Sequence, residues 1–593
     1  MSKKWIISPA PADEFLNLHP ELPPIVARLM YNRNLRTQEQ IDEFLNPDYL
    51  QDIHDPFLFN DMEKAVKIIF DCIAANKNIV VHGDYDADGV CAATIIISCL
   101  KKLGAQNVAV FLPHRETDGY GLNLNTVKAL KEKNTDLIIT CDCGVSNTPE
   151  VKLSKELGMQ VIITDHHSIP AQTPPADAII HPKMPNEKYP DKTLCGGAVA
   201  FKLIQALLKT HKKTNELLAD GQTHEAFEKW QLDLAAIASI GDMVPLLGES
   251  RTITRYGLTV LNKTKNIGLK KLMFVAGIAD EHGNLKRGQI DAGTVGFQIV
   301  PRINAAGRMD HANVAFALLM SEDEHEAENL AWALNQNNLD RQKLTENLVS
   351  QAIKQVKETE QGKNSMIFVL GEGWPTGILG LIAGRLKDMY YKPAIVMGLN
   401  RGEITASGRS ISEFNMVAAI QNNSEFFAKF GGHPQACGFT LKSLDVLKNF
   451  KKRFNEVAAE QTKEVELVPQ INIDAEVDLD EINWTLYDLL QKFEPFGMNN
   501  EEPKYVARGL TITGITPVGQ DGKHLKLMLK HNSQIVRKTI GFGLGDINRH
   551  KDDWKNTLHI GDKIDMAFSI EANEWNGSRD LQMTIADIKK SDQ

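Results

Sequence analysis

The amino-acid sequence predicts an α/β protein. A parallel-sheet domain comes first, followed by a long connecting helix, a smaller second α/β domain and a small C-terminal antiparallel barrel or sandwich. Three observations support this prediction. Apolar runs alternate with helical segments between residues 61 and 180, residues 320–358 contain no glycine or proline, and short alternating runs follow residue 466.

The first domain is predicted from four β-rich runs, with segments of helical periodicity between them. These runs are NIVV at 78–81, NVAVFL at 107–112, DLIIT at 136–140 and QVIIT at 160–164. Strands that alternate with helices form a parallel sheet with crossover helices. Because ligands of open parallel sheets bind beyond the carboxyl ends of the strands, we expect the functional residues there.

The middle of the chain predicts a helix and a second α/β domain. Residues 320–358 favour helix throughout and have polar faces, which fits a long connecting helix. The runs MIFVL at 366–370 and PAIVM at 393–397 read as strands. Glycine-rich segments at 371–380, 406–409 and 431–438 punctuate this region.

The C-terminal region predicts about five short strands. Apolar and polar residues alternate along four runs, at 509–518, 524–530, 563–573 and 580–588.

Bulk properties restrict the function classes only weakly. The chain has 593 residues and a formal net charge of −10, which argues mildly against a nucleic-acid binder unless a local basic groove exists. The seven cysteines include no C-x-x-C pair, so neither a disulfide framework nor a structural zinc site is expected. Without a signal peptide or a long apolar run, we expect a cytoplasmic protein with no membrane partner.

The stretch VVHGDYDADGV at 80–90 places three carboxylates, Asp84, Asp86 and Asp88, directly after a strand-like run. Clustered carboxylates repel one another, and a divalent cation such as Mg²⁺ or Mn²⁺ removes that cost. The preceding His82 lies within reach of the same ions and favours Mn²⁺. A solvent-facing turn is the alternative. An EF-hand fits poorly, because its closing glutamate would be Ile95.

Three further segments resemble ligand positions. Asp142 follows a strand in TCDCGVSN, Asp165, His166 and His167 follow another in TDHHS, and Asp242 lies in GDMVPL after an apolar helical segment. Each has a structural alternative: Asp142 as a helix cap, paired structural histidines, and Asp242 in a helix-ending turn. Together the segments predict one metal-binding crevice.

The order of these motifs resembles the DHH phosphoesterase superfamily. PRINAAGRMDHA at 301–312, GGHPQACG at 431–438, PHRETDGYGL at 113–122 and FEPFGMNNEEP at 493–503 are similar to the RecJ-type single-strand-specific DNA exonucleases. The resemblance covers about residues 20–590 and implies a DHH domain, a DHH-associated domain and a C-terminal oligonucleotide-binding (OB)-like β-barrel.

The resemblance implies a 5′→3′ exonuclease that releases 5′-mononucleotides from single-stranded DNA with two divalent cations, Mg²⁺ or Mn²⁺. The implied metal ligands are His82, Asp86, Asp88, Asp142, His166 and Asp242. Asp142 and Asp242 are the candidates for bridging both ions. Asp84 is implied as a ligand or as a group that orients one, and His167 as a contact to the scissile phosphate or its leaving oxygen.

The other motifs are implied to hold phosphate. The implied residues are Arg115, Arg302, Asn304, Arg308, Ser407, Arg409, Gly431, Gly432 and His433, with Arg308 and His433 beside the reacting phosphate. Arginine matches phosphate geometry, and glycines let backbone N–H groups approach it. For 301–312, a surface loop with solvated arginines is the alternative. Trp374 stands where the family more often has histidine, and core packing is the favoured interpretation.

The predicted domains are an N-terminal helical extension (1–60), a DHH catalytic domain (61–255), a linker with the long helix (256–360), a DHH-associated domain (361–462) and an OB-like domain (463–593). The resemblance also implies a role in DNA recombination and repair, with single-strand-binding protein and a DNA helicase as partners of a monomeric enzyme. Two other functions compete: a DHH phosphoesterase of small substrates, and a catalytically silent replication scaffold.

Overall fold

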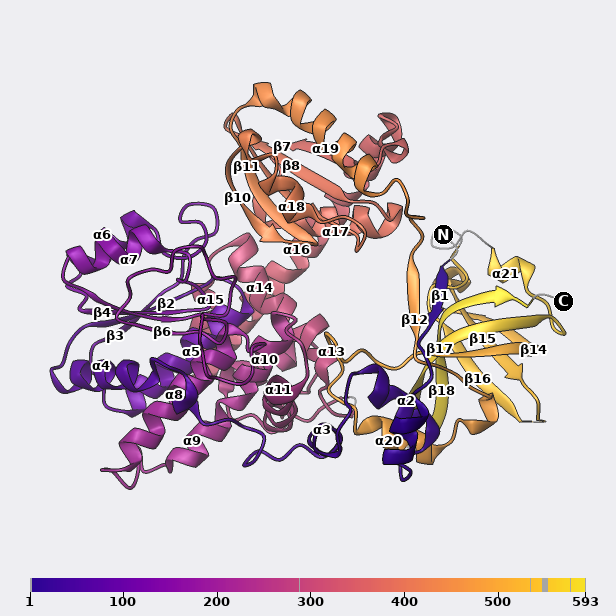
Figure 1. The fold of residues 1–593 in the computed structure, drawn as a ribbon, viewed down its shortest axis with the longest axis horizontal. Coiled ribbons are helices and arrows are strands. Elements are labelled where there is room, and N and C mark those ends of the chain that lie inside the picture. The colour runs from indigo at the N-terminus through magenta and orange to yellow at the C-terminus, as the bar shows by residue number, and fades with distance from the viewer. Residues whose placement is uncertain (1–2, 287, 534, 547–552, 576–577, 592–593) are drawn as a thin grey trace. The chain divides into compact units, whose positions relative to one another are not determined.

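Figure 1 shows the computed structural model, which describes residues 3–286, 288–533, 535–546, 553–575 and 578–591. The chain forms two compact units. One unit spans Asp48–Leu467, and the other combines Met1–Pro47 with Val468–Gln593.

The larger unit begins with the predicted parallel sheet. Its strand order is β3-β2-β4-β5-β6, and every neighbouring pair is parallel. The strands are β2 (Ile79–Gly83), β3 (Val108–Phe111), β4 (Leu137–Cys141), β5 (Gln160–Thr164) and β6 (Ala178–Ile180). The first four match the predicted runs. The short strand β6 was not predicted from the sequence.

Helices cover both faces of this sheet (Figure 1). One face carries α4 (Met62–Ala74), α5 (Ala87–Lys102) and α8 (Gly196–Lys212), and the other carries α6 (Leu124–Glu132) and α7 (Thr148–Glu156). Successive residues of a strand point to opposite faces. In β4, Leu137 and Ile139 therefore pack into the core on the α5 side, and Ile138 packs into the core on the other side. Burial on both faces explains why the strands read as continuous apolar runs.

The strand order creates a crevice between two strands. The chain leaves β2 towards β3 on one side of the sheet, and later adds β4 and β5 on the other side. The loops after β2 and β4 therefore diverge, and such a switch point is where parallel sheets bind ligands.

A helical layer connects the two sheets of this unit. Its helices are α9 (His224–Trp230), α10 (Leu232–Gly241), α11 (Gly248–Leu261), α12 (Ile267–Val275), α13 (Ala292–Thr294), the π-helical turn η2 (Val295–Ile299), α14 (Val300–Met309), α15 (Asn313–Met320) and α16 (Glu324–Glu358). The long helix α16 has 35 residues, as the composition of 320–358 predicts. It begins at Glu324 because the Asp323 side chain caps it by accepting the N–H of Glu326.

The second sheet has five strands in the order β10-β11-β9-β8-β7. They are β7 (Ile367–Glu372), β8 (Ala394–Asn400), β9 (Glu403–Arg409), β10 (Phe427–His433) and β11 (Ala436–Leu441), with α17 (Thr376–Tyr390), α18 (Met416–Gln421) and α19 (Leu447–Gln461). Only β7 and β8 pair in parallel. The glycine-rich segment 406–409 lies in β9, and most of 431–438 lies in β10 and β11. Glycine does not favour strands by itself, but the antiparallel neighbouring strands complete the backbone hydrogen bonds of these segments.

The smaller unit contains a closed barrel, because its strands pair in the order β14-β15-β16-β18-β17 and β17 pairs again with β14. Its elements are β12 (Gln470–Ile473), β13 (Ala475–Glu476), α20 (Trp484–Gln491), β14 (Tyr505–Val518), β15 (His524–Lys530), β16 (Val536–Gly541), α21 (Trp554–Thr557), β17 (Lys563–Trp575) and β18 (Ser578–Lys590). The described residues also form 3₁₀ turns, at η1 (Pro56–Leu58), η3 (Gln361–Lys363), η4 (Ser424–Phe426), η5 (Leu444–Val446), η6 (Leu479–Glu481) and η7 (Gln520–Gly522).

The N-terminal segment belongs to the barrel unit. Strand β1 (Lys4–Ile7) pairs in parallel with β12, and α1 (Asp13–Leu18), α2 (Pro24–Asn32) and α3 (Gln38–Leu45) follow it. Arg33 Nε donates to Asn500 Oδ1 at 2.8 Å. These contacts explain why residues from the two ends of the chain form one compact unit.

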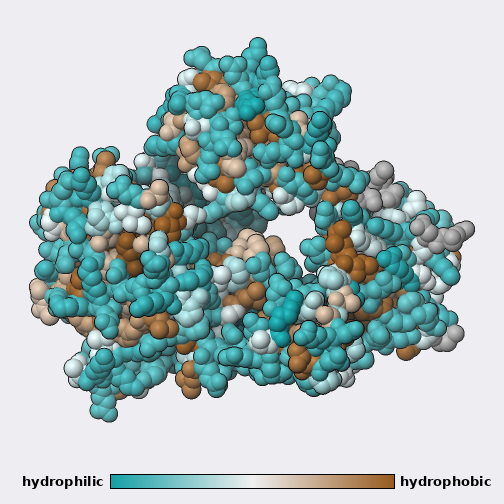
Figure 2. Space-filling model, viewed as in Figure 1, coloured by the Kyte–Doolittle hydropathy of each residue, from teal (hydrophilic) through white to brown (hydrophobic). Residues whose placement is uncertain are grey.

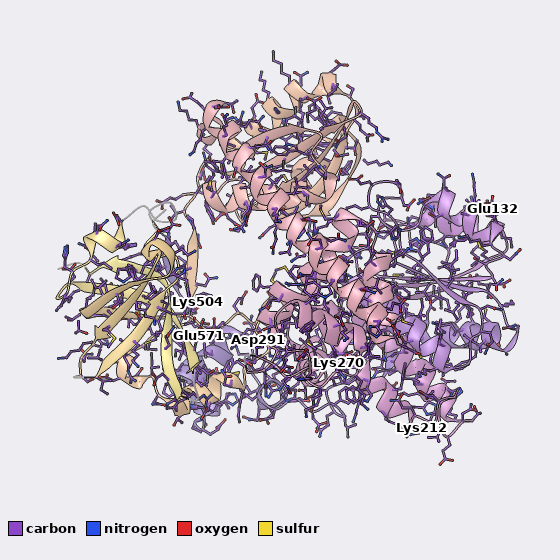
Figure 3. All side chains as sticks on the ribbon, turned by 180° about the vertical axis from the view of Figure 1, so that it is seen from behind. Glu132, Lys212, Lys270, Asp291, Lys504 and Glu571 are labelled. Atoms are coloured by element: carbon purple, nitrogen blue, oxygen red, sulfur yellow. The ribbon has the colours of Figure 1, made fainter. Side chains whose placement is uncertain are left out.

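Hydrophilic residues cover most of the face shown in Figure 2, and one apolar patch lies over β1 and β12. Charged side chains such as Glu132 on α6 and Lys212 at the end of α8 point outward (Figure 3). Among the residues that the structure describes, no helix combines the length and apolarity needed to cross a membrane.

Candidate active site

The predicted acidic segments converge at the carboxyl edge of the parallel sheet. Three overlapping groups have ligand atoms within 4.8 Å of one another. They are Asp84 with Asp86 and Asp142, Asp88 with His166 and Asp242, and Asp142 with His166 and His167. Because Asp142 and His166 each belong to two groups, the three form one continuous cluster.

Two helix N-termini face this cluster and stabilise its carboxylates. Asp86 caps α5, where its Oδ1 accepts the N–H groups of Asp88 at 3.0 Å and Gly89 at 3.1 Å. Asp88 accepts N–H groups from the first turn of α8, with Gly196 2.8 Å from Oδ2 and Gly197 2.6 Å from Oδ1. The positive end of a helix dipole favours such negative charge.

The glycine pair Gly196-Gly197 is a site feature that the sequence analysis missed. A Cβ atom on Gly196 would lie 2.5 Å from Cβ of Asp142, and one on Gly197 would lie 2.5 Å from Cβ of Ala238. Only glycine therefore lets α8 approach the acidic loops this closely. The sequence does carry a signal for this feature. Two adjacent glycines at the start of a long apolar helix are unfavourable for helix formation, which indicates a close approach of another segment.

Asp142 and His166 form the centre of the cluster, and neither is satisfied by protein. His166 Nε2 lies 3.1 Å from Asp142 Oδ1, 3.5 Å from Asp242 Oδ2 and 3.7 Å from Asp88 Oδ2. Within the described part of the chain, the buried atoms Asp142 Oδ1, His166 Nε2 and Asp84 Oδ1 have no hydrogen-bond partner. Asp142 also adopts a left-handed φ of 60°, a strained conformation typical of functional sites.

The pKa values of the cluster reflect carboxylates that are buried close to one another. Burial and then the charge of Asp242 raise the pKa of Asp88 well above its usual range, and burial and then the charge of Asp88 do the same for Asp142. Burial followed by the charge of Asp86 raises the pKa of Asp84 to about 8 and that of Asp242 to about 7. Burial and the charge of His167 lower the pKa of His166 to about 3, which leaves a neutral imidazole.

Divalent cations fit this donor set. Unpartnered carboxylate oxygens and a neutral imidazole nitrogen converge, and Mg²⁺ and Mn²⁺ take such oxygen ligands, with imidazole favouring Mn²⁺. A cation also removes the repulsion that raises the carboxylate pKa values.

His167 lies beside the cluster and is held by Asp165. Its Nδ1 is 2.8 Å from Asp165 Oδ1 and 3.0 Å from the hydroxyl of Tyr120. Burial lowers the pKa of His167, but the hydrogen bond to Asp165 and the surrounding carboxylate charges outweigh it and raise the value to about 9. His167 is therefore cationic at neutral pH, whereas its neighbour His166 is neutral.

His82 lies apart from the three ligand groups. It is fully buried in β2, and its Nδ1 is 3.7 Å from Cys143 Sγ. Burial lowers the pKa of His82 to about 4. Its Nε2 has no hydrogen-bond partner among the described residues, so its role as a ligand stays a prediction.

The segment 301–312 is largely helical, and α14 packs on the acidic loop after β2. Asn304 Oδ1 accepts the N–H of Ala87 at 2.7 Å, at the start of α5. A Cβ atom on Gly307 would lie 2.4 Å from the carbonyl oxygen of Tyr85. Arg115 joins this contact, because its Nε donates to the carbonyl of Gly307 at 3.2 Å and its guanidinium lies 3.9 Å from the centre of the Tyr85 ring.

Four arginines gather beside the acidic cluster. Arg308, at the end of α14, donates from Nη1 to the carbonyl of Gly377 at 2.8 Å. Burial, followed by the charges of Arg115 and Arg341 and more weakly Arg409, lowers the pKa of Arg308 to about 10. Arg341 on α16 was not predicted, and its Nε is buried without a hydrogen-bond partner in the described residues. This arginine cluster suits a phosphate, which forms bidentate hydrogen bonds with guanidinium groups.

Arg302 is directed elsewhere. Its Nε donates to Asn335 Oδ1 on α16 at 3.0 Å, and its Nη1 donates to the carbonyl of Gln298 at 2.6 Å. It therefore links α14 to α16, and its phosphate-binding role stays a prediction.

The second sheet supplies the remaining predicted residues. Arg409 Nη1 donates to Ser407 Oγ at 3.0 Å, so both predicted residues of β9 lie together. Gly431, Gly432 and His433 end the edge strand β10. Burial and the positive charges of His167 and Lys183 lower the pKa of His433.

Trp374 belongs to a hydrophobic core with Ile378 and Leu379 of α17, which confirms core packing.

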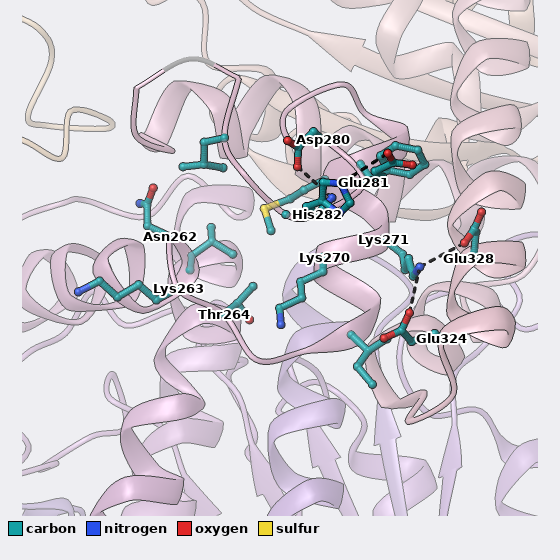
Figure 4. Close-up of a pocket in the computed structure, with 16 residues that line it drawn as sticks. Asn262, Lys263, Thr264, Lys270, Lys271, Asp280, Glu281, His282, Glu324 and Glu328 are labelled. Carbon is teal, nitrogen blue, oxygen red and sulfur yellow. Dashed lines mark hydrogen bonds and ion pairs between the residues drawn. The ribbon is translucent and has the colours of Figure 1, made fainter.

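A separate cavity of about 670 Å³ lies between α12, the 280–285 turn and the start of α16 (Figure 4). None of the predicted site residues lines it. Its Lys271 pairs with Glu328 at 3.2 Å and with Glu324 at 3.5 Å.

Family models match the chain in three places. One described as the DHH family, N-terminal domain, covers residues 78–238, the DHHA1 domain covers 362–460, and the RecJ OB domain covers 473–587. A single-stranded-DNA-specific exonuclease RecJ from Bacillus subtilis (strain 168) is 35% identical over 594 residues, covering 99% of this chain and 71% of the relative. The chain belongs to the RecJ family.

Other RecJ proteins agree along the full length. The single-stranded-DNA-specific exonuclease RecJ from Escherichia coli (strain K12) is 29% identical, covering 97% of each chain. A crystal structure of Thermus thermophilus RecJ in complex with Mn²⁺ has a TM-score of 0.81 and 26% identity, covering 100% of this chain and 80% of that chain. The OB-like barrel expected from the RecJ resemblance is thus confirmed.

Proposed function

We propose that this chain is a metal-dependent 5′→3′ exonuclease that hydrolyses single-stranded DNA to 5′-mononucleotides. The observation that carries the proposal is the pairing of two clusters in one unit. Buried, unsatisfied carboxylates and His166 lie next to an arginine cluster around Arg308. The first suits divalent cations and the second suits phosphate, which together are the needs of a phosphodiesterase.

Asp86, Asp88, Asp142, His166 and Asp242 would hold two Mg²⁺ or Mn²⁺ ions, with Asp142 and Asp242 as the bridging candidates. When bound, such a pair of ions supplies a hydroxide from bound water and neutralises charge on the phosphate. Asp84, whose Oδ1 is buried without a partner among the described residues, is a ligand or orients one. His82 is retained as a candidate ligand.

The arginine cluster would fix the phosphate against the ions. Arg308 stays cationic at neutral pH, because burial lowers the pKa of its guanidinium only to about 10. Arg409 also keeps its charge, because guanidinium groups are protonated at neutral pH in proteins. Arg115, Arg302, Asn304 and Ser407 complete the predicted phosphate-binding set. Gly431 and Gly432 lie in an edge strand, so backbone N–H groups on its free side can approach a phosphate.

His167 would contact the scissile phosphate and protonate its leaving 3′ oxygen. Its Nδ1 is engaged by Asp165 Oδ1, which leaves Nε2 to carry the transferable proton. Although burial lowers the pKa of His167, the hydrogen bond to Asp165 raises it, which favours a protonated ring. His433 would hold the same phosphate from the second sheet.

The barrel would guide single-stranded DNA, as OB folds do through electrostatics and base stacking. We assign residues 1–60 to an N-terminal extension, 61–255 to the DHH domain, 256–360 to the linker, 361–462 to the DHH-associated domain and 463–593 to the OB-like domain. The three ranges covered by family models fall inside these segments. We further propose that the enzyme is cytoplasmic and monomeric. It would act in recombination and repair, with single-strand-binding protein and a helicase as partners.

The test uses long single-stranded DNA labelled at its 5′ end, with Mn²⁺ or with EDTA, for the wild type and Asp142→Asn. Early release of labelled mononucleotide in Mn²⁺ alone, lost in the variant, is expected. Binding without cleavage would instead indicate a replication scaffold. Cleavage restricted to very short oligonucleotides would indicate a small-substrate phosphoesterase.

A further inference from the structure

The two adjacent histidines, His166 and His167, make different contacts: His166 Nε2 lies 3.1 Å from Asp142 Oδ1, and His167 Nδ1 lies 2.8 Å from Asp165 Oδ1. Their different roles require two fixed ring directions on neighbouring residues. His166 Nε2 makes no hydrogen bond to the described residues, so the direction of its ring depends on how the backbone is held. The contacts of that backbone are therefore informative.

The two N–H groups of this dipeptide are held by one carboxylate. Asp165 Oδ1 accepts the N–H of His166 at 2.7 Å and that of His167 at 3.1 Å. Asp165 Oδ2 accepts the N–H of Val145, at 2.9 Å, in the loop after β4. Asp165 thus links the dipeptide to the loop that carries Asp142.

The two carbonyl groups are held by residues that follow β6. Lys183 Nζ donates to the carbonyl oxygen of His166 at 2.6 Å. His181 Nε2 lies 2.9 Å from the carbonyl oxygen of His167. The sequence His181-Pro182-Lys183 therefore contacts both carbonyls of the dipeptide, and proline stiffens the segment by fixing its φ.

The ring of His181 has a defined tautomer. The backbone N–H of Lys183 donates to His181 Nδ1 at 3.1 Å, so Nδ1 must carry a lone pair. The proton then lies on Nε2, which donates to the carbonyl of His167. His181 is fully buried, which favours this neutral form. One side chain thereby couples the backbone of Lys183 to the backbone of His167.

We propose that His181 and Lys183 are positioning residues, which fix the rings of His166 and His167 by holding the carbonyl groups of both. This inference rests on the proposed function, because it concerns the metal ligand and the proton donor of the same site. Lys183 holds the metal ligand His166, and His181 holds the proton donor His167. Neither residue has to touch the metal or the substrate.

Lys183→Met is the first test, because it keeps most of the aliphatic chain and removes the ammonium group. Much of the Lys183 side chain is exposed, so the variant is expected to fold, and its unfolding temperature is measured beside that of the wild type. The Mn²⁺ dissociation constant, measured by electron paramagnetic resonance of free Mn²⁺, should rise about tenfold, as for other groups that orient metal ligands. Under saturating Mn²⁺, kcat should fall while KM for single-stranded DNA changes less than about twofold.

Two further variants separate positioning from other roles. Lys183→Arg keeps a donor for the carbonyl of His166 and should recover most of the Mn²⁺ affinity. Lys188→Met removes another exposed lysine of the same loop, whose side chain has no partner among the described residues, and should match the wild type.

Unchanged Mn²⁺ affinity and kcat in Lys183→Met would overturn the inference. A rise in KM alone would overturn it too and assign Lys183 to substrate binding. If Lys183→Met does not fold, His181→Gln, which keeps a donor for the carbonyl of His167, and His181→Leu, which does not, give the same contrast through kcat. A wild type that binds Mn²⁺ but leaves DNA intact would refute the proposed function, while the Mn²⁺ affinities would still decide the inference.

Discussion

The acidic cluster and the arginine cluster of the larger unit respond to burial in opposite ways. Burial and like charges raise the pKa values of Asp88 and Asp142, so their ionised form is unstable without a cation. Burial and like charges also lower the pKa of Arg308, but only to about 10, so it keeps its charge at neutral pH. Near neutral pH, protons and metal ions can therefore change the charge of the acidic cluster but not that of the arginine cluster.

This difference shows how the two clusters depend on ligands. In the proposed function, metal ions complete the acidic cluster, and its charge depends on whether they are bound. The arginine cluster keeps a fixed charge and would bind phosphate. We expect changes in one cluster to alter metal binding and changes in the other to alter DNA binding, and four experiments test this separation.

The largest effect is expected for Asp142→Asn. Asparagine tolerates the left-handed φ of residue 142, so the backbone should keep its conformation. Loss of the shared carboxylate should lower kcat by about 1,000-fold or more. The metal-free variant should unfold at a higher temperature than the metal-free wild type, because one buried like charge is gone. Calorimetry and single-turnover cleavage measure both.

The exposed Asp445→Asn is the matched control for this variant and should behave as the wild type. Retention of Mn²⁺-dependent cleavage within about tenfold in Asp142→Asn would show that Asp142 is not a ligand.

The next effect concerns the arginine cluster. Arg308→Met should lower kcat/KM by about 10- to 100-fold, the value of a hydrogen bond between charged groups. The loss should appear in KM, and the Mn²⁺ dissociation constant should stay unchanged. Arg385→Met on α17, an exposed arginine, is the control. A weaker Mn²⁺ affinity in Arg308→Met would mean that the clusters are not separable.

The third effect is the pH dependence of Mn²⁺ binding. Raised pKa values of about 8 for Asp84 and about 7 for Asp242 mean that the metal-free protein holds protons near neutral pH. Mn²⁺ must displace them, so its affinity should fall as the pH falls from 8 to 6, by about tenfold per unit when one proton is released. Titration calorimetry in two buffers measures the released protons, and an affinity constant across this range would contradict the expectation.

The same pKa values predict the stability of the metal-free protein. Folded-state pKa values above the ordinary 3.8 mean that the folded form binds more protons than the unfolded form. The contribution of these two carboxyl groups to the free energy of unfolding is therefore highest at low pH. It falls as the pH rises from about 4 to about 8.

The smallest effect is local protection from hydrogen exchange. Mn²⁺ at 100 times its dissociation constant should stabilise the folded form by about 2.7 kcal/mol and slow exchange in the loops at 84–89 and 142–146. A nucleoside 5′-monophosphate should instead slow exchange at 431–433. Protection of 431–433 by Mn²⁺ alone would show that the clusters are coupled before substrate binds.

Sequence patterns are enough to predict the first four strands of the parallel sheet, the long helix and the position of the acidic residues. Strands buried on both faces must be continuous apolar runs, and the carboxyl ends of parallel strands must share one edge. For that reason Asp86, Asp142 and His166 could be assigned to one crevice from their places in the sequence. The RecJ-type motifs then indicated what the crevice binds.

The groups that complete the site come together only through long-range contacts in the folded chain. Gly196 donates to Asp88 from a position 108 residues away, and Arg308 joins Gly377 across 69 residues. Arg302 likewise contacts Asn335, and Lys183 contacts the carbonyl of His166. Such contacts depend on the packing of helices against the sheet edge. Local sequence periodicity reports which face of an element is buried, but not which distant element covers it.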